Sequence, residues 1–346
     1  AQKKPEEWQK TVLHFGGGSD SYEQNKLANF LQQYKAIIED TLWGGKVYTF
    51  LKKTTQPFEF NLSDSLKNLI NNGVSMMTFF AHAAGVGFDM STDNPSEYNN
   101  RGKYFFILAN SCFAGDIFGN VGINSYGTTR SSSEEFVLIE NKGAIAYLST
   151  ISKSTPTPLH NYSLLFHKNI FTTNYGQSIG KAIQKTIDDL YVTNMQTKWV
   201  MLEMTLHGDP ALKLNCHNKP DYYVTPDKVF FNPSIPVAET DSFTVNIIVT
   251  NIGKAINDSF FVSIIRTLPN NEKITYIKKV VAPKYKDTLS FKIATEKEKA
   301  IGLNKFNIYI DSYNTIDELS EVNNNTSVTV MINTNNIIPI IPYKYA

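Results

Sequence analysis

The chain has 346 residues, of which 42% are hydrophobic, 12% aromatic and 19% charged. This length exceeds that of a typical single domain, so we expect two or more globular domains. A formal net charge of +1 gives no electrostatic reason to expect a nucleic acid or an anionic membrane as a partner. No apolar run is long enough for a transmembrane helix, so no membrane insertion is expected, and the first ten residues lack the pattern of a signal peptide.

The first two-thirds of the sequence alternates between strand-like and helix-like segments. Short apolar runs bounded by turn residues have the length and composition of buried strands. These runs are 12–15, 47–51, 76–81, 105–109 and 144–148. Apolar residues at three- and four-residue spacing predict helices over 27–38, 66–70 and 179–190. The alternation indicates an α/β domain over residues 1–216, with a mainly parallel sheet covered by helices on both faces.

The sequence pattern changes after Pro220. Over residues 221–334 the helical spacing gives way to two-residue alternation, as in the segment 243–249. Short strands separated by turn signals predict an all-β domain, an antiparallel immunoglobulin-like sandwich. The prolines within 335–346 predict the start of a linker to a further module.

Reactive side chains follow two of the predicted strands. The run 76–81 leads directly into His82, and the run 105–109 is followed closely by Cys112. Ligands of a parallel sheet bind beyond the carboxyl ends of its strands, so neighbouring strands would bring this imidazole and thiol into one crevice. Attack on a carbonyl needs a thiolate nucleophile and a histidine that transfers the proton. Small residues on both sides would let the backbone N–H groups of Cys112 and Ala83 form an oxyanion hole.

A lone cysteine after an apolar strand can also be a small buried hydrophobic residue. The spacing of Cys112 and His82 does not decide between this interpretation and catalysis. Cys216 has no obvious partner in the sequence, and we interpret it as a bystander thiol. The remaining histidines show no metal-ligand spacing and are predicted to be structural or surface residues.

Four segments, taken in order, resemble the gingipain-type cysteine peptidases of the caspase-like clan. VSMMTFFAH (74–82) resembles the turn and strand that carry the catalytic histidine, and NSCFAGD (110–116) resembles the nucleophile segment. Residues 133–150 resemble the helix and strand that follow the nucleophile. GDPALKL (208–214) resembles the motif that closes the peptidase domain. Together the segments cover roughly residues 8–214.

The resemblance implies that Cys112 is the nucleophile and that His82 acts first as general base and then as general acid, with no cofactor required. The family has glycine on both sides of this histidine, whereas the present chain has Ala81 and Ala83. Alanine retains the N–H group that the second glycine supplies in relatives, but it restricts the backbone angles.

In the family, an acid that orients the histidine and the residues that set P1 specificity come from an earlier stretch of the same domain. The resemblance begins in the middle of that domain, near Trp8, so we expect the earlier stretch to be missing. No third catalytic residue is therefore assigned from the sequence. Asp89 and Asp116 are close to the dyad in sequence, and both are predicted to be loop or cap residues.

These inferences predict a cysteine endopeptidase that acts on protein or peptide substrates through an acyl-enzyme. Relatives are exported by Bacteroidetes-type bacteria through the type IX secretion system, so the resemblance implies an extracellular or cell-surface location with surface or secretion-system partners. One alternative is a sortase-like transpeptidase, in which an amine resolves the acyl-enzyme. Another is a non-catalytic scaffold or adhesin. A third, a nucleotide-binding protein, depends only on the segment 16–19, which fits no phosphate-loop pattern and predicts a tight turn.

The second domain resembles the CARDB type of sandwich found in bacterial adhesion-related proteins. Oxygen-bearing side chains gather between two late predicted strands, at Asp311, Asn314, Glu318 and Glu321. Such a group either holds a structural Ca²⁺ or builds a turn by hydrogen-bonding its own backbone. The turn is the interpretation that the sequence favours.

Overall fold

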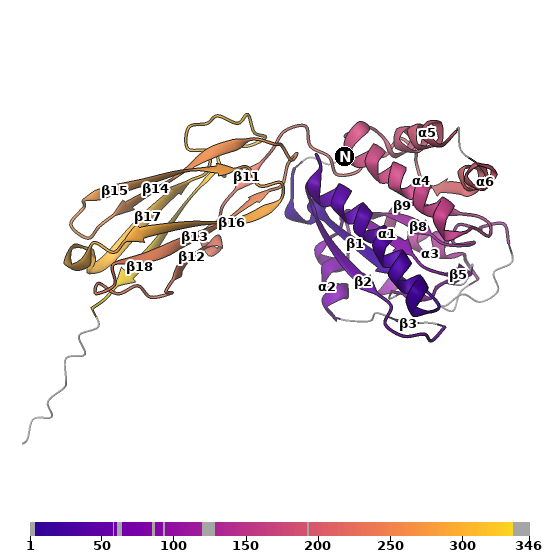
Figure 1. Ribbon diagram of the computed structural model, residues 1–346, viewed down its shortest axis with the longest axis horizontal. Helices are drawn as coiled ribbons and strands as arrows, with labels where there is room; N and C mark the ends of the chain where they lie inside the picture. Colours follow the sequence, from indigo (N-terminus) through magenta and orange to yellow (C-terminus); the bar gives the residue numbers. More distant parts are fainter. Residues whose placement is uncertain are drawn as a thin grey trace, which may run out of the picture. The chain divides into compact units, whose positions relative to one another are not determined.

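The computed structural model of the protein describes residues 4–57, 59–60, 64–84, 87–92, 94–119, 129–191 and 194–334. The chain divides into two compact units (Figure 1). Unit 1 comprises residues 1–218 with 252–255, and unit 2 comprises 219–251 with 256–346. The predicted linker over 335–346 lies outside the described residues.

Unit 1 is built on a six-stranded sheet in the order β10-β9-β8-β4-β1-β2. Its parallel strands are β1 (Thr11–Gly16), β2 (Lys46–Leu51), β4 (Met76–Phe80), β8 (Phe105–Asn110) and β9 (Ala144–Thr150). The edge strand β10 (Met204–His207) pairs antiparallel with β9. The mainly parallel sheet predicted from the sequence is confirmed.

Helices cover both faces of this sheet. One face packs against α1 (Ser21–Asp40), α4 (Pro156–Lys168), α5 (Ile179–Leu190) and α6 (Met195–Glu203), and the other against α2 (Asp64–Asn72) and α3 (Ser132–Leu138). Side chains alternate along the buried strands, so Met76 and Phe80 of β4 join the first core and Met77 and Phe79 join the second. Unit 1 therefore has three layers, as predicted (Figure 1).

Short elements complete unit 1. They are η1 (Glu7–Lys10), β3 (Glu59–Phe60), β5 (Ala83–Ala84), β6 (Gly87–Phe88), β7 (Met90–Ser91), η2 (Pro95–Glu97) and η3 (Asn169–Thr173). Strand β3 pairs with β7, and β5 pairs with β6 in a small hairpin immediately after β4. Among the described residues, no helix has the length and apolar character needed to cross a membrane.

Unit 2 consists of two antiparallel sheets that share one apolar core. In the first sheet β13 (Ser242–Asn251) pairs with β11 (Tyr222–Tyr223), β12 (Val229–Asn232) and β16 (Lys286–Ala294). The second has the order β15-β14-β17-β18, with β14 (Ser259–Thr267), β15 (Lys273–Val281), β17 (Gly302–Tyr309) and β18 (Asn325–Ile332). The short helices η4 (Pro226–Lys228) and η5 (Lys297–Ala300) lie in the connections. The predicted all-β architecture is confirmed.

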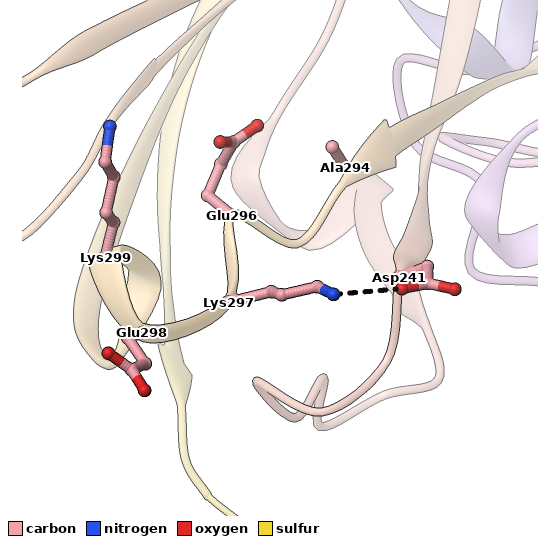
Figure 2. A pocket seen from close by; sticks show the side chains of 6 residues that line it. All are labelled: Asp241, Ala294, Glu296, Lys297, Glu298 and Lys299. Atoms are coloured by element: carbon pink, nitrogen blue, oxygen red, sulfur yellow. Dashed lines mark ion pairs between the residues drawn. The ribbon is translucent and has the colours of Figure 1, made fainter.

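A shallow depression in unit 2 lies beside η5 (Figure 2). Glu296 and Lys297 adopt left-handed backbone angles there, with φ of 68° and 46°. Charged side chains of both signs line it, and Lys297 Nζ lies 3.7 Å from Asp241 Oδ1. Both partners are largely exposed, so this ion pair adds little to stability.

Candidate active site

The topology of the sheet brings His82 and Cys112 to the same edge. Strands β4 and β8 are parallel neighbours, and Phe80 lies opposite Asn110 in their register. His82 and Cys112 each follow two residues later, at the carboxyl ends of these strands. Both side chains line one small cleft. Its other lining residues are Glu23, Leu27, Phe80, Ala81, Asn110, Ser111, Ser154, Pro156 and Leu159.

The turn that carries Cys112 is tied to the strands around it. Ser111 Oγ donates a hydrogen bond to the carbonyl oxygen of Ala81, the residue before His82. In the opposite direction, the Ala81 N–H donates to the Asn110 carbonyl oxygen at 3.4 Å. Phe113, directly after Cys112, has a left-handed φ of 56°. Non-glycine residues in this region are uncommon and often occur at functional sites.

The Cys112 thiol is half-buried and contacts the backbone of Ser154. Its Sγ lies 3.3 Å from the Ser154 carbonyl oxygen, to which the thiol donates. The Ser154 N–H lies 3.4 Å from the same sulfur. Both groups of Ser154 therefore fix the position of the sulfur at the mouth of the cleft.

The His82 imidazole is held through its Nε2 atom. Nε2 lies 2.8 Å from Glu23 Oε2 and 3.1 Å from Ser19 Oγ. Burial of Glu23 acts to raise its pKa, but hydrogen bonds from the Ser19 N–H and from His82 outweigh this effect and hold the pKa below its ordinary value. Glu23 is therefore a carboxylate at neutral pH. Among the described residues nothing hydrogen-bonds His82 Nδ1, so this nitrogen is available for proton transfer.

Asp89 holds the backbone around His82 in place. Its Oδ1 accepts the His82 N–H at 2.9 Å, and its Oδ2 accepts the Gly18 N–H at 3.0 Å. Lys52 Nζ lies 3.1 Å from the same Oδ2, and both side chains are buried. A Cβ on Gly17 would lie only 2.1 Å from Asp89 Oδ1, so glycine is required there. Asp89 is thus a structural acid of the site, in keeping with its interpretation as a loop or cap residue.

The backbone N–H groups of Cys112 and Ala83 are predicted to form an oxyanion hole, which requires that neither is used in a hydrogen bond within the protein. The Cys112 N–H makes no hydrogen bond to any described residue, whereas the next residue, Phe113, donates its N–H to the Ser152 carbonyl oxygen at 3.1 Å. The Asp89 N–H donates to the His82 carbonyl oxygen at 2.8 Å. In the antiparallel β5–β6 hairpin, this bond makes the adjacent pair of Ala83 and Phe88 a non-hydrogen-bonded one. The Ala83 N–H is therefore directed away from the partner strand.

Sequence reasoning missed two residues of this site, Ser19 and Glu23. Both lie after β1, whose carboxyl end adjoins that of β4. The sequence did hold one signal for them: β1 is a third strand whose carboxyl end lies at this edge, so residues that follow it can contribute side chains to the cleft. Asp116, the other acid considered, accepts the N–H groups of Phe118 and Gly119 at 3.0 Å, so it stabilises its own turn.

Three further histidines lie in the core behind the cleft. His14, His160 and His167 are buried around Tyr34, whose hydroxyl lies 2.9 Å from His160 Nδ1. Burial lowers the pKa of His160 and of His167 to about 4. These side chains are therefore neutral near pH 7 and pack as aromatic rings, with His167 stacked on Tyr34 at 4.5 Å between centroids.

The acidic segment of unit 2 forms a hydrogen-bonded turn. Asp311 Oδ2 accepts the Ile316 N–H at 2.7 Å, and the Asn314 N–H donates to the Asp311 carbonyl oxygen at 2.7 Å. Glu321 Oε1 accepts the Glu318 N–H at 3.1 Å. Among the described residues, no three His, Cys, Asp or Glu side chains are arranged to hold a metal ion. The turn supports the interpretation that the sequence favours, and calcium binding stays an untested prediction.

Comparisons with known families agree with the two-part organisation. The model of peptidase family C25 matches residues 1–215, and the CARDB model matches residues 219–328. A search of curated proteins finds no match.

Solved structures with similar folds include two gingipain structures and one CARDB domain. The Arg-specific cysteine proteinase gingipain R has 12% identity and a TM-score of 0.44, with 94% of this chain and 68% of that chain covered. The complex of the pro- and mature domains of RgpB from Porphyromonas gingivalis gives the same identity and TM-score, with 94% and 69% covered. The CARDB domain of a Pyrococcus furiosus protein, solved with two metal ions, has 20% identity and a TM-score of 0.26, covering 34% of this chain and 91% of that one. With a family model that matches more than half of its residues, the chain belongs to peptidase family C25.

Proposed function

We propose that this protein is a cysteine endopeptidase in which Cys112 attacks the peptide carbonyl and His82 transfers the protons. One observation carries the proposal. His82 and Cys112 line a single cleft at the carboxyl edge of the sheet, and the Glu23 carboxylate holds the imidazole there through Nε2. A nucleophile, a base and a group that orients the base are the three parts that covalent acyl transfer requires.

The geometry supports a two-stage reaction. His82 takes the proton of the Cys112 thiol through Nδ1, and the thiolate adds to the substrate carbonyl carbon. The N–H groups of Cys112 and Ala83 stabilise the resulting oxyanion, and Glu23 stabilises the imidazolium. The imidazolium then donates its proton to the leaving amine as the C–N bond breaks, which leaves a thioester on Cys112. His82 then deprotonates a water molecule, which adds to the thioester carbonyl and forms a second tetrahedral intermediate. Collapse of this intermediate breaks the C–S bond, releases the acid product and regenerates the thiol, which takes its proton back from His82.

The location of the protein and its partners are part of the proposal. We place the peptidase outside the cell or on the cell surface, with unit 2 as a spacer or interaction domain. The C25 and CARDB family matches support this location. Surface components and the type IX secretion system are the partners that the gingipain resemblance implies.

The proposal is tested by labelling the protein with peptidyl acyloxymethyl ketones and locating the adduct by mass spectrometry. We expect the adduct on Cys112, and we expect it to be lost in Cys112→Ala and in His82→Ala. Cys216 is the matched control, because burial raises the pKa of its thiol to about 11, and Cys216→Ala should label normally. Folded protein that never labels at Cys112 would identify a non-catalytic scaffold.

The fate of the acyl group separates hydrolysis from transpeptidation. A peptide substrate incubated with and without a primary amine should give the free acid as the main product in both cases. Accumulation of the amide product instead would show a sortase-like transpeptidase. Both outcomes require the same Cys112 thioester, so they leave the dyad assignment intact.

A further inference from the structure

We infer that the S1 subsite of this peptidase accepts only small uncharged side chains, and that Leu27, Phe80 and Leu159 set this limit. The inference rests on the proposed function, because it concerns the substrate of the Cys112 and His82 dyad. The inference depends on the size and charge of the cleft beside the thiol. These features are the same whether water or an amine releases the acyl group from Cys112.

The cleft that Cys112 and His82 line is the described space beside the thiol that a P1 side chain can enter. The carbonyl carbon attacked by the thiolate belongs to the P1 residue, and reacting atoms must approach to about 3–3.5 Å. The P1 Cα is bonded directly to that carbon, so its side chain begins within a few ångströms of Cys112 Sγ. Leu27, Phe80 and Leu159 belong to the same cleft as the two catalytic side chains.

The cleft is small because large apolar side chains fill its floor. Its volume is about 30 Å³. A water molecule needs about 10–15 Å³ on such a measure, so the space fits one or two waters or a methyl group. Leu27, Phe80 and Leu159 are each at most 3% exposed, which shows that they are packed into the core and do not project into solvent.

The side chains at the base of the cleft have little space into which they could move. The Phe80 ring packs against Phe30 with 5.4 Å between centroids, and Phe30 stacks on His160 at 3.8 Å. Close-packed interiors resist such displacement, since each ring would have to move into space that another residue occupies. A bulky P1 side chain would therefore meet a rigid wall.

Among the described residues, the cleft offers a cationic P1 side chain no carboxylate that is not already engaged. Among the described residues that line it, Glu23 carries the one carboxylate. Its Oε2 already accepts from His82 Nε2 and from the Ser19 N–H at 2.8 Å each. Arginine or lysine at P1 would lose water and would have to share the Glu23 carboxylate with His82, which disfavours binding. Glycine, alanine and serine are the P1 residues that fit both limits.

The test uses peptidyl acyloxymethyl ketones that are identical except at P1, with the second-order rate of Cys112 modification measured by mass spectrometry on the full chain. We expect P1 glycine, alanine and serine to react at least about tenfold faster than leucine, phenylalanine and arginine, the discrimination typical of a pocket that is too small. Faster reaction with P1 leucine or arginine would overturn the inference while the proposed function stands. Failure of every probe to modify Cys112 would overturn the proposed function and this inference with it.

Two pairs of variants test which residues set the limit. Leu27→Ala should raise the rate with P1 leucine relative to P1 alanine by about tenfold, because it removes part of the floor. Leu31→Ala is its control, since Leu31 is equally buried one turn later in α1 and does not line the cleft. Phe80→Ala and Phe79→Ala form an independent pair, because Phe79 packs on the opposite face of β4. Thermal melting identifies the variants that fold, and a folded Leu27→Ala or Phe80→Ala with the wild-type P1 profile would refute the role of that residue.

Discussion

Replacing Glu23 by glutamine tests the site most directly, because it removes one charge and keeps the shape of the side chain. In the protein, Glu23 Oε2 lies 2.8 Å from His82 Nε2 and accepts the Ser19 N–H at the same distance. The carboxylate favours the imidazolium that forms as the thiol loses its proton. Glutamine offers a weaker, neutral acceptor, or it presents an N–H that cannot pair with a protonated Nε2. We therefore expect slower acylation of Cys112 in a protein that still folds.

The expected loss follows from the exposure of the two partners. A hydrogen bond to a charged group contributes about 1.5–3 kcal/mol. The side chains of His82 and Glu23 are 50% and 23% exposed, so solvent screens the charge and the lower part of this range applies. About 1.5–2 kcal/mol corresponds to roughly a 10- to 30-fold lower rate. A fully buried orienting acid would give a larger loss, of the order of the 10⁴-fold reduction seen when the serine-protease triad aspartate is replaced.

The assay is the second-order rate of Cys112 modification by a P1 alanine acyloxymethyl ketone. Glu39→Gln is the matched control, since Glu39 also lies in α1 and pairs with Lys35 at 2.6 Å. It removes the charge of an α1 glutamate that does not line the cleft, and it should keep the wild-type rate. A Glu23→Gln rate within twofold of wild type would refute the orienting role. Equal losses in Glu23→Gln and Glu39→Gln would show that the effect comes from the helix and not from the imidazole.

Three other substitutions test what stabilises each unit separately. Asp89→Asn leaves the buried Lys52 ammonium without its counter-ion, so urea denaturation should show unit 1 less stable by about 3–5 kcal/mol. Arg266→Ala leaves the buried Asn304 side chain and two carbonyl oxygens without their donor, and it should destabilise unit 2 by about 3 kcal/mol in the same assay. Burial raises the pKa of Glu318 to about 8, so the stability gained from its protonated form is complete below about pH 4.5 and is lost as the pH rises through 8. Glu318→Gln should therefore be more stable than wild type at pH 9, and it should melt at a higher temperature there. After allowance for partial solvation, the expected difference in the free energy of unfolding is about 2 kcal/mol at pH 9 and close to zero at pH 4. Calcium that raises the melting temperature of wild type at pH 9 but not of Glu318→Gln would show a metal site in place of the hydrogen-bonded turn.

The sequence was sufficient to place His82 and Cys112 together, because the end of a strand can be recognised from the local pattern of apolar residues. Each residue directly follows a short apolar run, and parallel neighbours bring their carboxyl ends to one edge. Glu23 could not be recognised in this way. It stands in the first helical turn after the N-cap Asp20, a position where acids commonly stabilise a helix. Its Oε2 accepts the Ser19 N–H as a helix-terminal acid would, and the same oxygen also reaches His82.

The floor of the cleft was hidden for a related reason. Leu27 follows the three- and four-residue spacing of α1, and Phe80 continues the apolar run of β4, so both fit the pattern of ordinary core residues. They are core residues, and the cleft is shallow because of it. The pairing of β4 with β8 brings Phe80 close to the thiol, and only the placement of α1 over the carboxyl edge of the sheet adds Leu27. That placement depends on tertiary packing, which no single-segment pattern encodes.

The buried Lys52 and Asp89 pair is better explained by positioning than by stability. Removing two charges from water costs more than their attraction commonly returns, and well-packed apolar residues can replace such pairs without loss. An apolar pair at these positions, however, could not accept the N–H groups of Gly18 and His82, which Asp89 holds at 3.0 and 2.9 Å. Those two bonds connect the turn that carries Ser19 to the backbone of His82. Gly17 is constrained by the same carboxylate, because any Cβ there would overlap it. A chain with an apolar pair would therefore be expected to keep the three-layer fold and lose the register between Glu23 and His82, which is the register that acyl transfer needs.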